Sequence, residues 1–254
     1  MSDVTESNIT DIEFILASDV VGVSMLVDCI NHRLPGGATP TTVTGLFHIH
    51  DSPNLDDGAD IAQRGPGERC FIVGSVRDLQ GRPITGATLD ICIRQADGDG
   101  LYEVRRGSAE PWMRGAFKSR QDGSFIVQTM LPVPHSIPLD GSVGELMLRT
   151  DISPMRPSHV HFLIKAPGYR EVITRLSKKS CPYLKTDAIY GVKAPLIAEF
   201  RQVEAGARLP TGAIADQPFW LLEYDFILPP TSRTSCNAAS RKQQFEANGS
   251  YRTP

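Results

Sequence analysis

Residues 156–162 read Arg-Pro-Ser-His-Val-His-Phe and place two histidines, His159 and His161, two positions apart in a run typical of a β-strand. Because side chains alternate between the two faces of a strand, both imidazoles point to the same face. Two imidazoles on one face can share a metal ion. The alternative is a half-buried strand with two hydrogen-bonded histidines, since His-x-His is a short motif. The stretch therefore predicts a strand and raises the hypothesis of a metal site.

Outward from this stretch, short runs rich in β-forming residues recur between turns that contain Gly and Pro. Such regular spacing is typical of an antiparallel sandwich, so the sequence predicts an all-β fold. The expected strands are 70–77, 87–94, 124–130, 160–165, 171–176, 196–201 and 220–228, with a short strand around 42–48.

The two ends of the chain have different patterns. From about Thr10 to His32, apolar residues recur at three- and four-residue spacings, which predicts one amphipathic helix and is the only strong helix signal. From Thr231 onward the chain is rich in Ser, Arg, Gln and Asn and poor in apolar residues, which predicts a disordered tail. We expect a helical segment at 1–34, a β-sandwich domain at 35–230 and a tail at 231–254.

The composition excludes several classes of protein. The 254 residues carry a net charge of −3 without any Lys/Arg block, which argues against a nucleic-acid partner. The acidic start lacks the features of a secretory signal, and no apolar run is long enough to span a membrane. We therefore expect a cytoplasmic protein with a small-molecule partner. The five cysteines are an odd number without Cys-x-x-Cys spacing, so we expect buried, reduced thiols.

Further motifs occur in a fixed order along the chain. They are residues 22–28 (Gly-Val-Ser-Met-Leu-Val-Asp), 81–88 (Gly-Arg-Pro-Ile-Thr-Gly-Ala-Thr), 132–138 (Pro-Val-Pro-His-Ser-Ile-Pro), 140–144 (Asp-Gly-Ser-Val-Gly) and 187–192 (Asp-Ala-Ile-Tyr-Gly-Val). With these motifs the chain resembles the intradiol ring-cleavage dioxygenases, and within them the hydroxyquinol 1,2-dioxygenase branch, from about Ile15 to about Pro229. The resemblance implies a small aromatic diol or triol and O2 as partners.

The resemblance also implies a non-haem ferric ion, Fe(III), held by two tyrosinates and two histidines. Residue by residue, Tyr102 takes the place of the first tyrosine, and His159 and His161 take the places of the histidines. Phenolate oxygen is a hard, anionic ligand that stabilises Fe(III), whereas imidazole binds without adding charge. Taken alone, Tyr102 after a Gly-rich turn is more often an aromatic residue at the start of a strand.

The second tyrosine of the family pattern is replaced by His135 in this chain. In the family, this tyrosinate leaves the metal when the diol binds and accepts a proton. A neutral imidazole can bind iron, dissociate and accept a proton near pH 7, so His135 is a candidate ligand and base; the alternative is an ordinary loop histidine. Losing one phenolate leaves the ferric centre one unit more positive, which raises its reduction potential.

The resemblance places six residues around the substrate. Arg156 takes the place of an arginine that stabilises negative charge as O2 attacks; its alternative role is a surface ion pair. Arg175 stands where relatives have glutamine or histidine, and either adds positive charge to the site or points elsewhere. Asp19 either accepts a hydrogen bond from a third ring hydroxyl or is a solvated helix carboxylate. The apolar walls are Leu16, Val43 and Ile189, and Val43 and Ile189 are equally compatible with plain core.

The leading hypothesis is an enzyme that inserts both atoms of O2 into a catechol or hydroxyquinol ring and cleaves it between the two hydroxylated carbons, with Tyr102, His135 and Arg156 in catalytic roles. One alternative is a catalytically impaired relative that keeps the sandwich, and the altered ligand set favours it. Another is an enzyme of secondary metabolism with a different aromatic substrate. Because the chain begins inside the first helical region of relatives, which they use to dimerise, we expect a weaker or altered homodimer.

Overall fold

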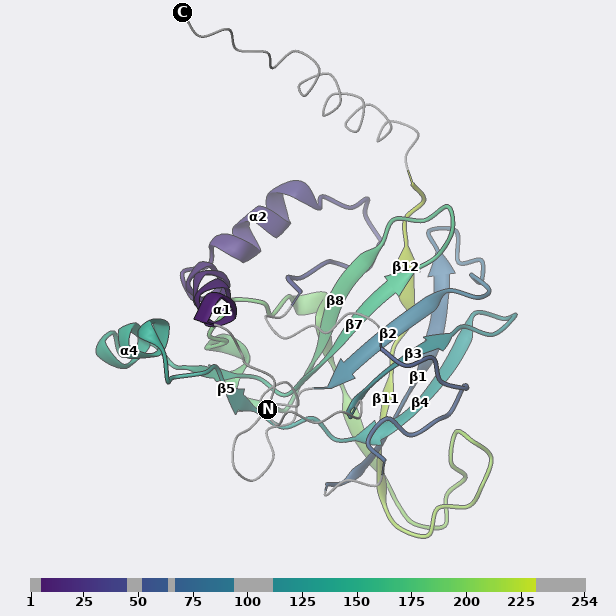
Figure 1. Ribbon diagram of the computed structural model, residues 1–254. Coiled ribbons are helices and arrows are strands. Elements are labelled where there is room, and N and C mark those ends of the chain that lie inside the picture. Colours follow the sequence, from purple (N-terminus) through teal and green to yellow (C-terminus); the bar gives the residue numbers. More distant parts are fainter. Residues whose placement is uncertain (1–5, 45–51, 64–66, 94–111, 232–254) are drawn as a thin grey trace, which may run out of the picture.

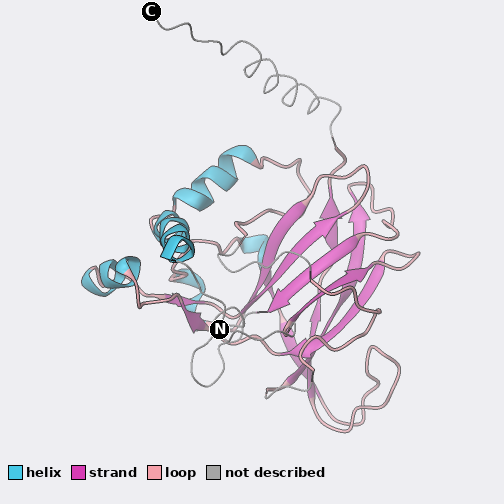
Figure 2. Ribbon diagram, viewed as in Figure 1, coloured by secondary structure: helices cyan, strands magenta, loops and turns pink. Residues whose placement is uncertain are grey.

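A computed structural model describes residues 6–44, 52–63, 67–93 and 112–231 of the chain. Two β-sheets pack face to face, and the helices gather at one side of them (Figure 1, Figure 2). The all-β sandwich that the strand pattern predicted is confirmed. The helices lie outside the sandwich and cover only part of it.

The first sheet consists of β1 (Arg69–Asp78), β4 (Ser124–Met130), β10 (Phe200–Val203), β11 (Phe219–Glu223) and β12 (Phe226–Leu228). Its order is β10–β11–β1–β12, and β4 pairs with β1. The expected strand 220–228 is interrupted at residues 224–225. There the Asp225 carboxylate accepts hydrogen bonds from the backbone N–H and the hydroxyl of Ser75. The interruption splits the parallel pairing of β1 between β11 and β12.

The second sheet consists of β2 (Thr88–Ile93), β3 (Arg114–Lys118), β7 (His159–Lys165), β8 (Val172–Lys178) and β9 (Ile197–Ala198), in the order β3–β2–β7–β8–β9. Strand β9 joins β8 in parallel, and the other pairings are antiparallel. A separate ribbon pairs β5 (His135–Ser136) with β6 (Met155–Arg156). The sequence pattern did not predict β3, β5 or β6, because they are short and rich in polar residues or glycine.

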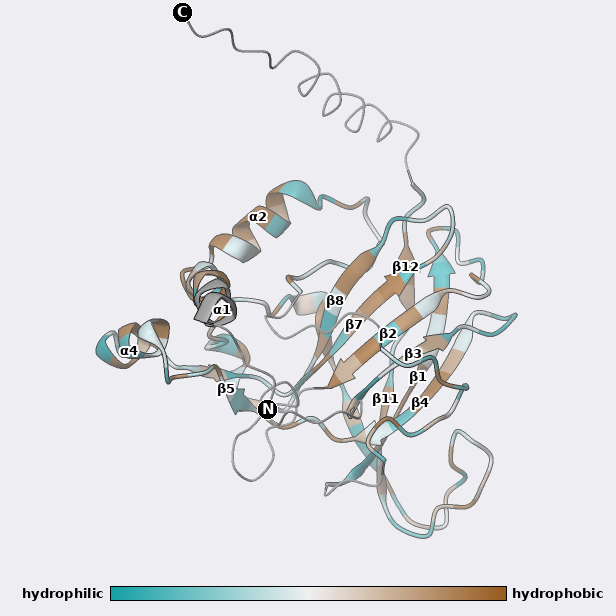
Figure 3. Ribbon diagram, in the orientation of Figure 1, coloured by the Kyte–Doolittle hydropathy of each residue, from teal (hydrophilic) through white to brown (hydrophobic). Residues whose placement is uncertain are grey.

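Alternation along β7 separates the core from the site. Val160, Phe162 and Ile164 point into the core between the two sheets and are almost fully buried. Burying a large apolar side chain contributes roughly 1.5–3 kcal/mol. The strands of this sheet are hydrophobic along much of their length (Figure 3). His159 and His161 therefore face away from the core, on the face where Arg175 of β8 reaches Met25 of α2.

Two helices, α1 (Glu6–Val20) and α2 (Val23–Asn31), replace the single helix expected from Thr10 to His32. The chain breaks at Gly22, whose φ of 77° lies in the left-handed region that glycine adopts without strain. The ring of Tyr190 packs against Gly22 and leaves little room for a side chain. The prediction of one continuous helix was wrong because the apolar spacing continues across this break.

A further helix, α4 (Ser142–Arg149), was not predicted from the sequence. Its Val143 N–H donates to the carboxylate of Glu13 on α1 at 2.9 Å, across 130 residues of sequence. A carboxylate at this position satisfies an otherwise unpaired N–H and interacts favourably with the helix dipole. No local pattern signals a cap from so distant a residue. Two 3-10 turns, η1 (Pro182–Lys185) and η2 (Ala194–Leu196), lead into and out of the loop at 186–193.

The structure also bears on the expectations for membrane-spanning helices, for the cysteines and for a short strand at 42–48. In the described ranges, no helix has both the length and the apolar character to cross a bilayer. Cys70 and Cys181 are buried as expected, Cys92 is partly buried, and Cys29 is exposed on α2, so the expected burial was wrong for Cys29. Of the short strand expected at 42–48, residues 42–44 are irregular, and the rest lies outside the described residues.

Candidate metal centre and active site

His159 and His161 form a close pair on β7. Their Nε2 atoms are 3.0 Å apart, and their rings are inclined at 75°. Both side chains are buried, and only 1% of His159 is exposed. The Nδ1 of His159 lies 2.5 Å from the carbonyl oxygen of Pro157, so Nδ1–H donates to this oxygen. The Nε2 of His159 is then the nitrogen with a free lone pair, as in a metal ligand.

The surroundings of His159 keep its imidazole neutral. Burial lowers the pKa of His159 well below its ordinary value, and the positive charge of Arg156 and the neighbouring His161 and His135 lower it further. The hydrogen bond to the Pro157 carbonyl acts in the opposite direction. Because metals bind neutral imidazole, His159 is available as a ligand without first losing a proton.

The spacing of the two ring nitrogens fits a shared metal ion. Two nitrogens at about 2.1 Å from one ion, and about 90° apart as seen from it, lie about 3.0 Å from each other. The observed Nε2–Nε2 distance is 3.0 Å. The same distance also fits a hydrogen bond in which one ring donates to the other. The pair is buried and neutral at His159, so its donor chemistry suits a metal.

His135 lies beside this pair. It is buried on β5, opposite Arg156 of β6, and its ring centroid is 5.2 Å from that of His159. Within the described residues, however, no group of three or more His, Cys, Asp or Glu side chains has the arrangement of a metal site. Tyr102 lies outside the described residues. The ligand roles of His135 and Tyr102 therefore stay predictions.

Arg156 enters the site from β6 as part of a buried ion pair, not a surface one. Its Nε donates to Asp187 Oδ1 at 3.3 Å, and Asp187 Oδ2 accepts from the backbone N–H of Gly191 at 2.8 Å. Both partners of the pair are buried. In the part of the chain that the structure describes, Nη2 of Arg156 has no hydrogen-bond partner. This guanidinium therefore keeps donor capacity for a ligand.

Asp19 on α1 reaches the same region. It is buried, so the alternative of a solvated helix carboxylate is wrong. Burial raises the pKa of Asp19, a hydrogen bond from Ser24 and the charge of Arg156 lower it, and the charge of Asp187 raises it; the net shift is upward. Helix α1 thus adds a carboxylate close to the Arg156–Asp187 pair.

A cavity of about 830 Å³ lies between α1, α2, residues 41–44 and the start of β8. Two of the expected pocket residues, Asp19 and Val43, line it, as does Ile173 of β8. Leu16 and Ile189 lie in a buried apolar cluster against which Val43 also packs. Leu16 and Ile189, which were expected to form apolar walls, are not among the residues that line this cavity.

Arg175 lies on β8, opposite His161 in the register of the two strands. Opposite residues of an antiparallel pair share a face, so Arg175 extends on the same side as the two histidines. Its guanidinium packs against Gly191, and Nη2 lies 3.9 Å from the Sδ atom of Met25 on α2. Arg175 therefore adds its positive charge to this region instead of pointing elsewhere.

Sequence reasoning missed three residues that position the others, namely Pro157, Asp187 and Gly191. They act through a backbone carbonyl, a buried ion pair and a close approach to a guanidinium. All three lie in motifs that carried the family resemblance, which was the available signal. The contacts themselves join strands and loops that are remote in sequence, so no local pattern reveals them.

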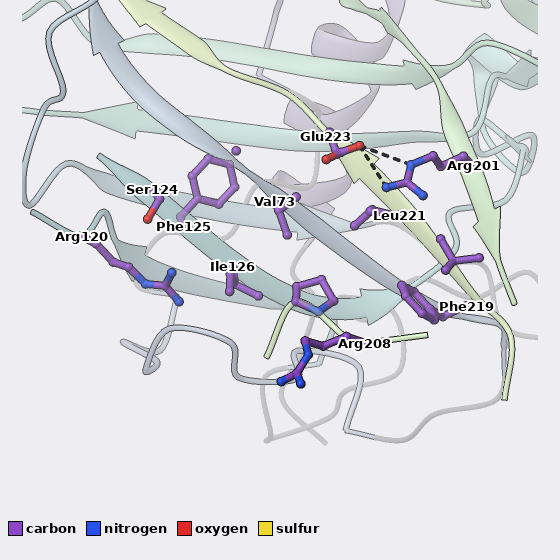
Figure 4. Close-up of a pocket in the computed structure, with 13 residues that line it drawn as sticks. Val73, Arg120, Ser124, Phe125, Ile126, Arg201, Arg208, Phe219, Leu221 and Glu223 are labelled. Atoms are coloured by element: carbon purple, nitrogen blue, oxygen red, sulfur yellow. Dashed lines mark hydrogen bonds and ion pairs between the residues drawn. The ribbon is translucent and has the colours of Figure 1, made fainter. Parts of the chain in front are cut away.

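A second cavity, of about 450 Å³, lies on the first sheet, on the face turned away from the sandwich core (Figure 4). Arg120, Arg201 and Arg208 stand around an apolar floor, and Arg201 pairs with Glu223 at 3.3 Å. Its lining contains no histidine or cysteine. The chemistry of the histidine pair is therefore separate from this cavity.

Comparison with known proteins agrees with this geometry. Residues 43–230 match the sequence model of the family described as Dioxygenase. The chain is 39% identical over 218 residues to a hydroxyquinol 1,2-dioxygenase of Rhizobium sp., covering 85% of this chain and 73% of that protein. It is 37% identical over 239 residues to an intradiol ring-cleavage dioxygenase of Aspergillus niger, covering 93% and 71%. The crystal structure of hydroxyquinol 1,2-dioxygenase from Pseudomonas putida matches with a TM-score of 0.80 at 40% identity, covering 86% and 76%.

The β-sandwich, together with the match of residues 43–230 to the Dioxygenase model, shows that the chain is a dioxygenase. Within that class, the chain belongs to the intradiol ring-cleavage dioxygenase family.

Proposed function

We propose that the chain cleaves a catechol or hydroxyquinol ring between its two hydroxylated carbons and inserts both atoms of O2. The observation that carries the proposal is the buried His159–His161 pair, whose Nε2 atoms are 3.0 Å apart. The pair lies beside two buried arginines, in a chain about 40% identical to proteins named hydroxyquinol 1,2-dioxygenase. A catecholic ring is an anion when bound, and buried guanidinium groups suit an anionic ligand.

Four residues would hold a non-haem Fe(III) ion in this proposal: His159, His161, Tyr102 and His135. The fixed tautomer and neutral state of His159 support its part in this set. A ferric ion bound there supplies the Lewis acid and redox centre of ring cleavage. One phenolate in place of two leaves that centre with less negative charge from the protein than the family pattern provides.

The protein's own groups bind and orient the substrate. Arg156, aligned by Asp187, offers its unpaired Nη2 donor to negative charge that develops on the ring and on oxygen. Asp19 accepts a hydrogen bond from a ring hydroxyl. His135 accepts a substrate proton, because an imidazole takes up a proton near neutral pH. The cavity between α1, α2 and β8, of about 830 Å³, is large enough for the ring.

Iron content tests the metal site apart from activity. The purified protein, loaded with iron, is expected to hold about one iron per chain, and the double variant His159→Ala/His161→Ala is expected to lose it. His32→Ala removes a half-exposed histidine on the end of α2 and is the matched control, with iron retained. Tyr102→Phe is expected to remove the visible phenolate-to-iron band. Full iron content in the double variant would exclude this site.

One observation favours a second candidate function, that of a catalytically impaired or repurposed member of the family. His135 occupies the position where the family pattern has a tyrosine, and it is buried against the histidine pair. Such a protein binds metal and phenols but turns over slowly, or it acts on a different aromatic compound. Turnover of hydroxyquinol by the iron-loaded protein separates the two candidates.

We also propose that the chain acts in the cytoplasm and forms a homodimer through its helices. Large apolar side chains remain exposed on α1, α2 and α4, among them Phe14, Leu26, Ile30 and Leu148. A soluble protein that exposes such a surface gains stability by covering it.

A further inference from the structure

A buried carboxylate joins helix α2 to segments that are remote in sequence. Asp28 on α2 is 5% exposed. Its Oδ2 accepts hydrogen bonds from Lys193 Nζ at 3.0 Å and from Thr41 Oγ1 at 3.2 Å, and its Oδ1 lies 2.8 Å from His32 Nδ1. Lys193 Nζ also donates to the carbonyl oxygen of Thr41 at 2.6 Å. Asp28 thus binds α2 both to the segment at 39–44 and to Lys193.

The segment at 39–44 is attached to the sandwich. The Thr42 N–H donates to the carbonyl oxygen of Ile173 on β8 at 2.8 Å. The Thr174 hydroxyl, on the same strand, donates to the carbonyl oxygen of Pro40 at 2.8 Å. These bonds fix the segment to β8, so α2 is the element that the carboxylate of Asp28 holds against the sandwich.

The other partner, Lys193, ends the loop that orients a buried arginine of the site. In this loop, Asp187 accepts from Arg156 through Oδ1 and from the backbone N–H of Gly191 through Oδ2. Lys193 follows Gly191 by two residues and donates to the carboxylate on α2. The ion pair therefore connects helix α2 with the loop that aligns Arg156.

The ion pair lies at the cavity of about 830 Å³. Val27 and Asp28 of α2 line this cavity, and so do Thr41 and Ile173 on the sandwich side. The Asp28 carboxylate accepts from the Thr41 hydroxyl, and Lys193 donates to both residues. These bonds bridge the helical and the sandwich parts of the lining. The separation of α2 from β8, and with it the width of the cavity, depends on them.

Helix α2 has few other anchors. All nine of its residues are described, and only Met25 and Asp28 among them are buried. The contact of the Met25 sulfur with Arg175 Nη2 is 3.9 Å long, and a thioether is a weak acceptor. The side chains of the ion pair are 24% exposed at Lys193 and 5% at Asp28. A buried ion pair has a desolvation cost that apolar side chains avoid, so what it adds here is a defined geometry.

We propose that Asp28 and Lys193 are positioning residues of the active site, whose ion pair sets the width of the cavity and steadies the loop that aligns Arg156. This inference rests on the proposed function, because it takes the cavity as the place of the aromatic ring. Neither residue is a metal ligand or a proton donor in the reaction. Loss of the pair therefore weakens ligand binding and leaves iron on the histidines of β7.

The affinity of the iron-loaded protein for catechol, measured by anaerobic calorimetry, tests the proposal. Asp28→Asn and Lys193→Met are each expected to raise the Kd about tenfold, with iron content unchanged, because a displaced wall no longer fits the ring. The double variant is expected to lose no more than either single one, since both remove the same interaction. Lys193→Arg keeps the charge and is expected to restore most of the affinity. Lys179→Met, which breaks an exposed pair with Glu199, is the matched control.

Calorimetry separates positioning from a loss of fold. Unfolded molecules lower the number of binding sites per chain, whereas a misplaced wall raises the Kd of the folded ones. Lys193 is the more exposed partner, so Lys193→Met carries the test if Asp28→Asn does not fold.

Three results overturn the proposal: wild-type affinity in the folded variants, a loss of affinity in Lys179→Met as large as theirs, or a loss of iron together with affinity. Variants that bind catechol as tightly as wild type contradict only the positioning role. A wild type that binds neither catechol nor hydroxyquinol contradicts the proposed function as well.

Discussion

Two features of its surroundings make His159 suitable as a metal ligand. The alternation of β7 turns it away from the core, and one backbone carbonyl, that of Pro157, fixes which nitrogen carries the proton. Burial and the charge of Arg156 then keep the ring neutral. A neutral imidazole with an oriented lone pair is what a metal ion requires.

Restoring a phenolate at position 135 tests whether charge limits turnover. His135→Tyr is expected to lower the ferric reduction potential and to raise the rate of ring cleavage on hydroxyquinol or catechol by about tenfold or more, which corresponds to about 1.4 kcal/mol of barrier. His135→Ala is expected to abolish activity. Steady-state oxygen uptake measures both. Brisk turnover by wild type that slows in His135→Tyr would show that the imidazole is an adapted ligand or base.

The buried pair of Arg156 and Asp187 is expected to contribute to stability as well as to the site. Asp187→Ala leaves the Arg156 guanidinium buried without its partner, so we expect the free energy of unfolding to fall by about 3–5 kcal/mol. Glu223→Ala breaks the exposed pair with Arg201 and is expected to cost about 1 kcal/mol or less. Urea unfolding compares the two variants. A similarly small loss of unfolding free energy in both variants would mean that Arg156 and Asp187 do not form the buried ion pair.

Single residues differ in how well the sequence predicts them. The shared face of His159 and His161 follows from the two-residue period of a strand, and the structure has them there. The partnership of Arg156 with Asp187 does not follow, because 31 residues separate them and the strands β7 and β8 lie between them in the sequence. The sequence also did not decide whether Asp19 is buried, since a carboxylate on a helix is usually solvated.

At the scale of elements, the end of β1 offers a test by pH. The Asp78 carboxylate accepts hydrogen bonds from the backbone N–H groups of Gln80 and Arg82, and it pairs with Arg82 Nε at 2.7 Å. Burial raises the pKa of Asp78, but the hydrogen bonds from Arg82 and Gln80 outweigh it and hold this pKa below its ordinary value. A depressed pKa in the folded state contributes stability above the unfolded pKa of about 3.9 and loses it as the pH falls below that value.

Asp78→Asn is therefore expected to be less stable than wild type at neutral pH. The difference in unfolding free energy should shrink as the pH falls below about 4, where the wild-type carboxyl takes up its proton. Urea unfolding at several pH values measures this. A difference that is constant down to pH 3 would show that the charge of Asp78 has no part in holding the turn.

Elements with strong local patterns were predicted, and those set by distant contacts were not. Strand β4 has the bounds expected from its apolar residues. The observed bounds of β1, β2, β7 and β8 differ from the expected ones by one or two residues at one or both ends. Helix α4 begins where the Glu13 carboxylate accepts a hydrogen bond from the Val143 N–H. The strand expected at 220–228 is interrupted where the Asp225 carboxylate accepts a hydrogen bond from the Ser75 N–H. The parallel pairs of β1 with β11 and β12 likewise depend on the whole fold.

At the scale of the whole molecule, the helices are expected to carry the dimer contact. The exposed large apolar residues described on α1 and α2 are Phe14, Ile15, Val23, Leu26, Val27 and Ile30. A stable interface commonly uses about 20–30 residues on each side, so we expect a homodimer that dissociates on dilution through the micromolar range. Leu26→Lys with Ile30→Lys should give a monomer, whereas Ile214→Lys, on an exposed loop by the first sheet, should not. Sedimentation velocity measures this. A dimer that persists at nanomolar concentration, or a monomer at all concentrations, would contradict it.

The division into a helical segment at 1–34 and a sandwich domain at 35–230 stays a prediction, with the family match at 43–230 lying inside the second part. The sandwich, the histidine pair and the two buried arginines meet only in the folded molecule. Helix α2 contacts the face of β7 and β8 that carries His159, His161 and Arg175, through Met25 and Arg175.

Ring cleavage under ¹⁸O2, followed by mass spectrometry of the product, tests intradiol cleavage at the histidine pair. The iron-loaded protein with hydroxyquinol or catechol is expected to give a ring-opened diacid that carries two labelled oxygen atoms, with the break between the hydroxylated carbons. His159→Ala/His161→Ala is expected to give none. A product with one labelled atom or a break at another bond, or equal product from the double variant, would contradict intradiol cleavage at the histidine pair.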